Sequence, residues 1–248
     1  MKSNCSIALG VGGFLMLALS GFAAEKKVAE ADLFMHVTNA FVAPTSAAKL
    51  PRVFIIGDSI SIGYTDPVRK TLQGKAEVYR PPENCQHTGH GLARIKTWVG
   101  TNKWDVIHFN FGIWDTHMLD PAGKLIPLKE VPNRTDLHIR YTPDQYRTNL
   151  TRIVEMLQAT GASLVWASTT PIMSRTGERF EDIKTLNRVA DEVMRSKNIP
   201  IDDLYEFVLP NVKNWQNSDK VHFNRTGNEE LAKKVSGAIL EAMKTRPK

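Results

Sequence analysis

Val53-Phe54-Ile55-Ile56-Gly57-Asp58-Ser59 is the stretch that decides the fold of this chain. Its four consecutive large apolar residues predict a strand that is buried on both faces, and Gly57 ends the strand. Ser59 therefore follows the carboxyl end of the strand, which is the edge where open α/β sheets bind their ligands. The hydroxyl of Ser59 is a candidate nucleophile, provided that another side chain can accept its proton.

Strand and helix patterns alternate along the rest of the chain. Further strands are predicted at residues 76–79, 105–112, 163–167 and 200–204, and helices at residues 66–74, 92–99, 143–161, 180–193 and 226–243. Strands that are separated by helices need crossover connections, which make a sheet mostly parallel and place helices on both of its faces. We therefore expect an α/β fold: a three-layer α/β/α domain with a mostly parallel five-stranded sheet.

The amino-terminal residues have the layout of a secretory signal peptide. Lys2 precedes an apolar run from Ile7 to Leu19, and small residues follow at positions 21–24. The run is short for a membrane span, so an uncleaved anchor is the weaker alternative. We expect a signal peptide at residues 1–24, a lead-in segment at 25–50 and one catalytic domain at 51–248, with export to the periplasm or the medium and no stable membrane insertion after cleavage.

Composition restricts the classes of partner. The 248 residues carry a formal charge of +6, but lysine and arginine are scattered and form no basic stripe with aromatic residues, so no nucleic-acid partner is expected. After signal cleavage Cys85 is the only cysteine, which leaves no internal disulfide. The histidine spacings fit no metal-ligand pattern, and no organic cofactor is implied. Composition does not indicate an oligomeric state.

Residues 113–141 have the composition of a long loop. Pro121, Gly123, Pro127 and Pro132 are spread through them. A loop of that length inside a compact domain is unusual and is often a substrate-facing insertion. We expect a small hairpin within it, formed by residues 125–128 and 137–141.

A second chemical motif, Asp219-Lys220-Val221-His222, lies near the carboxyl terminus. A serine hydroxyl needs an imidazole to accept its proton and a carboxylate to orient that imidazole. The offset of three residues allows Asp219 to reach one ring nitrogen of His222, while the other nitrogen faces Ser59. Both motifs together predict a serine nucleophile at the carboxyl edge of the sheet.

Gly57-Asp58-Ser59-Ile60 and Asp219-Lys220-Val221-His222-Phe223, in this order, resemble the first and last blocks of the GDSL/SGNH hydrolase superfamily. The resemblance covers most of the chain from Arg52 to the last helix. It implies a flavodoxin-like sheet, with Ser59 as nucleophile, His222 as general base and Asp219 as the orienting carboxylate.

The same resemblance implies an oxyanion hole, whose donors are less clear in this chain. The second block of the family offers a glycine amide, for which Gly89 and Gly91 are available, whereas a gap-free alignment places Cys85 at the donor position. The third block normally supplies an asparagine, where this chain has Trp114 in Gly112-Ile113-Trp114-Asp115. Either the indole N–H of Trp114 or the amide of Asn110 is the expected replacement.

These features predict an exported serine esterase that removes small acyl groups, chiefly acetyl, from a polysaccharide or from an ester-bearing small molecule. Trp114 and Trp215 lie in or near loops, where they could stack on a sugar ring or pack in the protein. A lysophospholipase or thioesterase that acts on lipids is the alternative enzyme. A catalytically inactive carbohydrate-binding protein of the same fold is the alternative outside enzymes.

Overall fold

The structure is a computed structural model that describes residues 39–45, 49–126, 130–172 and 178–245. The chain divides into two units, Met1–Asn39 and Ala40–Lys248, and all helices and strands below belong to the second unit. The predicted signal peptide at residues 1–24 lies outside the described residues, as does most of the lead-in segment. In the part of the chain that is described, no helix is long and apolar enough to cross a membrane.

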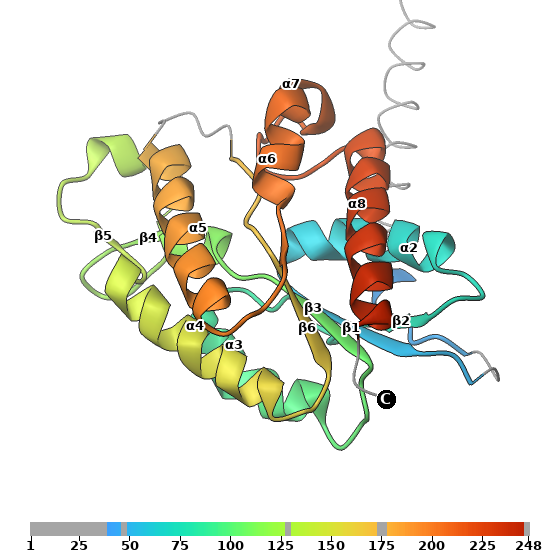
Figure 1. Ribbon diagram of the computed structural model, residues 1–248. Helices are drawn as coiled ribbons and strands as arrows, with labels where there is room; N and C mark the ends of the chain where they lie inside the picture. Colours follow the sequence, from blue (N-terminus) through green and yellow to red (C-terminus); the bar gives the residue numbers. More distant parts are fainter. Residues whose placement is uncertain (1–38, 46–48, 127–129, 173–177, 246–248) are drawn as a thin grey trace, which may run out of the picture. The chain divides into compact units, whose positions relative to one another are not determined.

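Five parallel strands form the central sheet (Figure 1). They are β1 (Arg52–Ile56), β2 (Glu77–Tyr79), β3 (Val106–Phe109), β6 (Ser163–Ala167) and β7 (Ile201–Asp202). Their order is β2-β1-β3-β6-β7 and every pair is parallel, which confirms the predicted sheet. This is the flavodoxin-like order, in which the topological switch point lies between β1 and β3.

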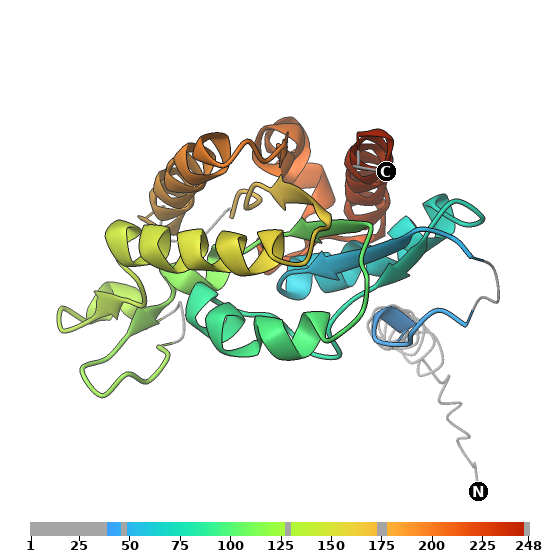
Figure 2. The same ribbon diagram turned by 60° about the horizontal axis from the view of Figure 1, so that its bottom comes forward.

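Helices cover both faces of the sheet, as Figure 2 shows, and complete the predicted three-layer α/β/α arrangement. One layer contains α2 (Ser59–Thr71), α6 (Leu204–Val208), α7 (Val212–Trp215) and α8 (Arg225–Lys244). The other layer contains α3 (Thr88–Val99), α4 (Pro143–Gln158) and α5 (Glu178–Ser196).

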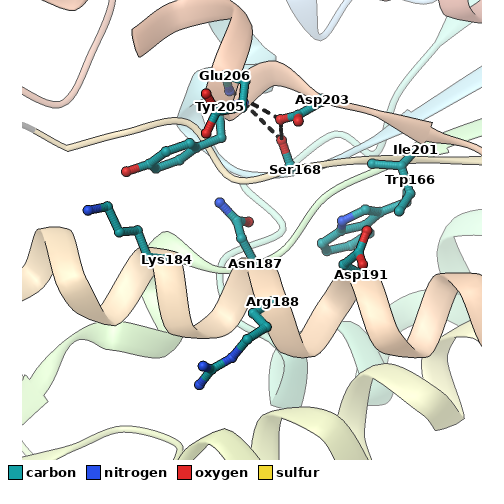
Figure 3. Close-up of a pocket in the computed structure, with 10 residues that line it drawn as sticks. All are labelled: Trp166, Ser168, Lys184, Asn187, Arg188, Asp191, Ile201, Asp203, Tyr205 and Glu206. Atoms are coloured by element: carbon teal, nitrogen blue, oxygen red, sulfur yellow. Dashed lines mark hydrogen bonds between the residues drawn. The ribbon is translucent and has the colours of Figure 1, made fainter.

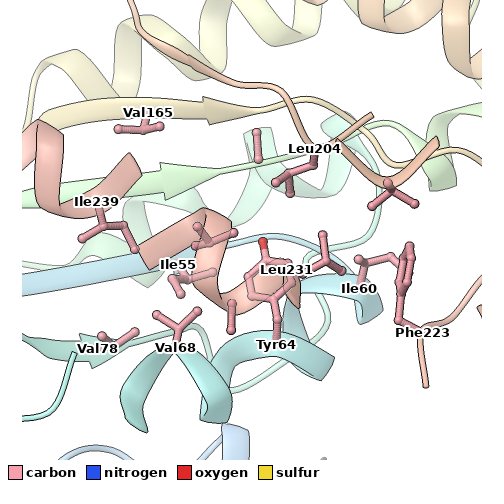
Figure 4. Close-up of a cluster of buried hydrophobic side chains, with 14 of the residues drawn as sticks. Ile55, Ile60, Tyr64, Val68, Val78, Val165, Leu204, Phe223, Leu231 and Ile239 are labelled. Atoms are coloured by element: carbon pink, nitrogen blue, oxygen red, sulfur yellow. The ribbon is translucent and has the colours of Figure 1, made fainter. Parts of the chain in front are cut away.

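Strand β1 is buried on both faces because successive side chains point to opposite sides of a sheet. Val53 and Ile55 pack against the layer of α2 and α8, where Tyr64 and Leu231 also lie (Figure 4). Phe54 and Ile56 belong to the cluster under α3, α4 and α5. The unbroken apolar run is therefore explained by two cores, and it fixes the position of Ser59 at the end of the strand.

Two helices start earlier than the sequence pattern predicts. Helix α2 begins at Ser59 rather than at residue 66, because the Asp58 side chain accepts the Ile60 amide and caps the helix. Helix α3 begins at Thr88 rather than at residue 92, because the His87 ring caps it by accepting the amide of His90. The glycines at 89 and 91 favoured a loop in the sequence, but the cap overrides them.

The insertion at residues 113–141 contains short elements. They are the 3₁₀ helices η1 (Ile113–Thr116) and η2 (Val131–Asn133) and the strands β4 (Met118–Leu119) and β5 (His138–Ile139), which pair antiparallel. The predicted hairpin is thus wrong in its first strand: β5 pairs with β4 and not with residues 125–128. Residues 127–129 lie outside the described residues.

Side-chain caps also define the starts of α4 and α8. Thr142 and Gln145 form the predicted capping box at the start of α4. Asn224 caps α8 by accepting the amide of Gly227. Helix α6, the 3₁₀ helix η3 (Leu209–Asn211) and α7 follow β7 without a break, and they hold the loop that carries Asp219 and His222.

Candidate active site

Ser59 is the first residue of α2 and follows the turn that ends β1. Asp58 accepts the amide of Ile60 at 3.0 Å through Oδ1, so the helix start is satisfied by the residue before Ser59. The amide N–H of Ser59 itself has no acceptor among the described residues. A free N–H at a helix amino terminus attracts negative charge, because the helix dipole adds to it.

His222 is brought to Ser59 by a tight turn. Asp219 Oδ1 accepts the amides of Val221 and His222, both at 2.9 Å. Lys220 between them has a φ of 60°, in the left-handed region, as such a tight turn demands. The Asp219 Oδ2 to His222 Nδ1 distance is 2.7 Å, and the His222 Nε2 to Ser59 Oγ distance is 2.8 Å.

Serine, histidine and aspartate thus form one hydrogen-bonded chain. Burial opposes ionisation of Asp219, but the amide of Val221, the ring of His222 and its amide outweigh burial and hold the pKa of Asp219 below its usual value. An ionised Asp219 accepts Nδ1–H, so Nε2 is free to accept the proton of Ser59. The His222 side chain is 45% exposed, which leaves the group open to a large substrate.

Arg80 lies beneath the Ser59 turn, and sequence reasoning missed it. Its guanidinium donates to the carbonyl of Gly57 at 3.3 Å, to Ser61 Oγ at 3.2 Å and to Thr65 Oγ1 at 3.1 Å. Arg80 is 8% exposed, and no carboxylate lies within 4 Å of it among the described residues. No motif in the sequence indicated this role, because it depends on three neutral acceptors that only the fold assembles.

Cys85 contacts the same turn from the connection between β2 and α3. Its amide donates to the carbonyl of Gly57 at 3.3 Å, so the N–H that the alignment offers to an oxyanion is already engaged in this structure. Burial raises the pKa of the Cys85 thiol to about 12, which keeps it protonated. Gln86 next to it has a φ of 53°, and its amide donates to Asn84 Oδ1.

Gly89 and Gly91 lie inside α3 and not in a loop, which corrects the sequence prediction. The Gly91 amide donates to the His87 carbonyl at 3.0 Å, and a Cβ at this position would lie 2.7 Å from Phe111 Cζ. A Cβ on Gly89 would lie 2.0 Å from the hydroxyl of Tyr141. Both glycines therefore allow close packing of α3, and Gly91 has no amide left for an oxyanion.

Asn110 is not placed as an oxyanion donor. Its Nδ2 donates to the carbonyl of Ala167 at 2.8 Å and to Thr169 Oγ1 at 3.1 Å, which uses both amide hydrogens. Its backbone amide donates to the carbonyl of Ile56. Asn110 therefore joins the ends of β1, β3 and β6, and the chemistry predicted for its side chain is not available in this geometry.

The indole N–H of Trp114 remains available as a hydrogen-bond donor. It is half-buried in η1, packs against the cluster that contains Ile60 and Phe223, and its indole N–H has no acceptor among the described residues. Its ring centroid lies 4.7 Å from that of His117. Trp114 follows β3, and Ser59 follows β1, the neighbouring strand, so both residues lie at the carboxyl edge of the sheet.

Asp115 connects this segment to α3. It is fully buried and accepts the Thr88 amide at 3.0 Å and the Thr88 hydroxyl at 2.5 Å. Burial raises the pKa of Asp115 to about 7, although the bonds from Thr88 and the charge of Arg140 oppose the rise. The carboxyl group thus holds the start of α3 against the end of β3.

Trp215, the weaker sugar-stacking candidate, ends α7. Its ring centroid lies 5.5 Å from that of Phe207, and the side chain packs against the core beneath α8. The structure therefore places Trp215 in a protein packing contact. Among the described residues, no three His, Cys, Asp or Glu side chains gather closely enough to hold a metal ion.

A cavity of about 250 Å³ with both polar and aromatic lining residues opens between α5 and α6, at the carboxyl ends of β6 and β7 (Figure 3). Lys184 and Asn187 extend from α5 toward Tyr205 of α6, whereas Arg188 points away from it. Ser168 and Asp203 are hydrogen-bonded at its floor. Its lining mixes acids, bases, an amide and aromatic rings, which suits a ligand rich in hydroxyl groups.

A parallel sheet in the order β2-β1-β3-β6-β7, with a hydrogen-bonded serine, histidine and aspartate at its carboxyl edge, defines the SGNH class of hydrolase fold. The chain belongs to the GDSL-like lipase/acylhydrolase family, whose model matches residues 55–230. This confirms the resemblance drawn from the two motifs. The comparison with curated proteins found no match.

Solved structures support the same fold. A lipase/acylhydrolase from Enterococcus faecalis is 22% identical, with a TM-score of 0.61 over 77% of this chain and 95% of its own. The acetyl xylan esterase AlAXEase is 16% identical, with a TM-score of 0.60 over 76% and 99%. The psychrotrophic esterase EstA from Pseudoalteromonas sp. is 14% identical, with a TM-score of 0.59 over 78% and 99%.

Proposed function

We propose that this protein is an exported serine esterase that removes small acyl groups, chiefly acetyl, from a polysaccharide. The observation that carries the proposal is the continuous hydrogen-bonded chain from Asp219 through His222 to Ser59, with distances of 2.7 and 2.8 Å. Export rests on the layout of residues 1–24.

The reaction begins when Ser59 Oγ attacks the ester carbonyl and its proton moves to His222 Nε2. Asp219 stabilises the imidazolium through Nδ1–H and keeps the ring in place. The tetrahedral intermediate collapses, and His222 gives the proton to the leaving alcohol. Water then attacks the acyl group on Ser59 with His222 again as base, which releases the acid and restores the serine.

The negative oxygen of the intermediate needs donors that are free before the reaction. Two N–H groups at this edge of the sheet meet this condition: the amide of Ser59 and the indole N–H of Trp114, neither of which has an acceptor among the described residues. We assign both to the oxyanion hole. The amide of Cys85 joins them only if it leaves the carbonyl of Gly57, to which it is bound at 3.3 Å.

A polar substrate agrees with the surroundings. His222 and Asp219 are about half exposed, which leaves the site open to a polar substrate in solvent. One similar fold belongs to an acetyl xylan esterase.

The decisive test is labelling by a fluorophosphonate, a reagent that reacts with activated serines. We expect one label for each wild-type molecule and none for Ser59→Ala, while Ser61→Ala, a neighbouring serine in the same helix, keeps the label. The similar esterase EstA was itself solved in a form inhibited by monoethylphosphonate. Folded wild-type protein that stays unlabelled would sink the serine-hydrolase proposal.

The substrate is tested by rates on acetyl and octanoyl esters of one alcohol. We expect a clear preference for acetyl, because His222 and Asp219 are about half exposed, so that a long acyl chain held at Ser59 would stay in contact with water. Faster hydrolysis of the octanoyl ester would favour the lipid-esterase alternative. Labelling without turnover of either ester would leave the nucleophile in place and reject the small-acyl substrate.

A further inference from the structure

Three side chains that each keep at least one N–H or O–H without an acceptor among the described residues gather where the insertion at residues 113–141 meets the start of α3. Arg140 follows β5, and its Nε donates to the carbonyl of Trp114 at 3.1 Å. Its two terminal nitrogens have no acceptor among the described residues, and no described carboxylate lies within 4 Å of them. A half-buried guanidinium that is fixed by Nε presents its remaining N–H groups as a preformed fork for an anion.

His87 is the second donor. Its Nδ1 accepts the amide of His90 at 3.1 Å, so the proton of the neutral ring lies on Nε2, which has no acceptor among the described residues. Burial lowers the pKa of His87 to about 4, and the charges of Arg140 and His90 add to the effect. The ring is therefore a neutral hydrogen-bond donor at neutral pH.

Tyr141 is the third donor. Its ring centroid lies 5.6 Å from that of His87, and its hydroxyl occupies the space over Gly89 that any side chain there would fill. No described residue accepts a hydrogen bond from this hydroxyl. The group also lies against the amino terminus of the 12-residue helix α3, whose dipole favours a negative ligand.

The nearest acid does not neutralise this group. Asp115 influences both Arg140 and Tyr141, but it is fully buried and both of its oxygens accept bonds from Thr88. Because burial also raises its pKa to about 7, Asp115 carries less than a full negative charge near neutrality. The donors therefore keep a net positive potential toward solvent.

Trp114 connects this group to the proposed chemistry. Its carbonyl accepts the Nε–H of Arg140, and its segment follows β3, whose end lies next to the end of β1 that carries Ser59. A substrate whose ester lies at Ser59 would reach the three donors with a neighbouring substituent. Acceptor-only, planar and negatively charged groups match a fork of N–H donors best, which describes a carboxylate.

We propose that Arg140, Tyr141 and His87 bind a carboxylate on the substrate, so that the enzyme selects acyl esters of acidic sugars over those of neutral sugars. This inference rests on the proposed esterase function, because it names the substrate class of that same site.

The test compares two acetylated methyl glycosides that differ in one group: a galacturonide, with a carboxylate at C6, and a galactoside, with a hydroxymethyl. We expect wild-type kcat/KM to be higher for the galacturonide. Arg140→Gln should lower the ratio of kcat/KM for the galacturonide to that for the galactoside about tenfold to a hundredfold, the usual loss for a charge-assisted bond. Arg134→Gln is the matched control, since Arg134 lies in the same insertion but is exposed and paired with Asp136.

Equal losses on both substrates, or no loss on either, would overturn the carboxylate site. The two glycosides without their acetyl groups are also titrated by calorimetry, a measurement that needs no turnover. Tighter binding of the acid to wild type, but not to Arg140→Gln, supports the site even if the esterase proposal fails. Equal binding of both glycosides to wild type rejects it, whereas failure of the esterase proposal shows as absent fluorophosphonate labelling.

Discussion

Trp114 occupies the position at which the family pattern has an asparagine, and the proposed oxyanion hole therefore includes its indole N–H. We expect Trp114→Phe to lower kcat on the order of a hundredfold, because one preformed donor is lost while an aromatic ring remains. KM should change little, because the donor acts on charge that develops in the transition state. Steady-state kinetics on an acetyl ester check this.

Trp114→Asn is the informative companion variant, since it restores the donor type of the family. Recovery of part of kcat relative to Trp114→Phe would assign the loss to the missing N–H. Thermal unfolding of both variants shows whether packing against the core beneath α2 and α8 is disturbed. Full activity of Trp114→Phe would remove the indole from the oxyanion hole.

The sequence predicted which residues would meet where local motifs decide the contact. Ser59 follows an apolar run, and Asp219 and His222 are linked by a three-residue turn, so their meeting required only the order of the strands. Asn110 shows the limit: its residue type suited an oxyanion, but its amide joins β6 in the fold. Arg80 and Arg140 escaped notice because an arginine's role depends on the acceptors around it, and these come from distant segments.

At the scale of the elements, the connection between β2 and α3 supports the turn between β1 and α2. Arg80 comes directly after β2 and binds Gly57 and Ser61, two residues on either side of Ser59. Burial lowers the pKa of Arg80, but free arginine titrates far above neutral pH, so the guanidinium keeps its charge. The buried guanidinium of Arg80 therefore fixes the Ser59 turn through three neutral acceptors.

We expect Arg80→Met to lower kcat at least tenfold, because the Ser59 amide and hydroxyl lose their fixed position. Arg80→Lys should fall between this variant and wild type, since it keeps the charge but cannot bridge all three acceptors. Kinetics and thermal unfolding are measured together. Arg94→Lys is the control, because Arg94 lies on α3 and is paired with Glu83 instead of with the Ser59 turn. If kcat of Arg80→Met stays at the wild-type value, Arg80 does not position the nucleophile.

The early starts of α2 and α3 have a common cause. Asp58 and His87 cap these helices with their side chains, and both caps stand next to residues that weaken a helix pattern: Ser59 with Ser61, and Gly89 with Gly91. Apolar periodicity finds the middle of a helix and not its capped end. Both caps lie at the candidate site, where the pattern gave the boundaries least accurately.

At the scale of the whole molecule, the sheet was predictable because each parallel strand must be apolar on both faces. Strands β1, β3 and β6 are such runs, and the helices between them fix the crossover order. Strand β4 was not predictable, because Met118–Leu119 is too short to carry a period. The order of the sheet then places the ends of β1 and β3 side by side, which brings Ser59 and Trp114 to one edge.

The carboxyl edge of the sheet buries Asp115, an acid whose ionisation opposes folding. The pKa of Asp115 therefore predicts how the stability of the protein depends on pH. Burial raises the pKa of Asp115 from 3.8 to about 7. Between these values the folded chain keeps the proton that the unfolded chain releases, so the folded state binds more protons and loses stability as pH rises toward 7. His87, whose pKa is lowered to about 4, acts in the opposite direction below pH 6.5, so wild type alone does not isolate Asp115.

The comparison with Asp115→Asn isolates it, because asparagine keeps an acceptor for Thr88 but does not titrate. We expect the free energy of unfolding of wild type, relative to this variant, to fall by on the order of 2–4 kcal/mol between pH 5 and pH 8. Thermal unfolding at several pH values measures this as a melting temperature that declines more steeply in wild type. Asp144→Asn, at an exposed position in α4, should run parallel to wild type. Parallel curves for Asp115→Asn as well would mean that Asp115 is ionised across this range and that its charge is compensated in the fold.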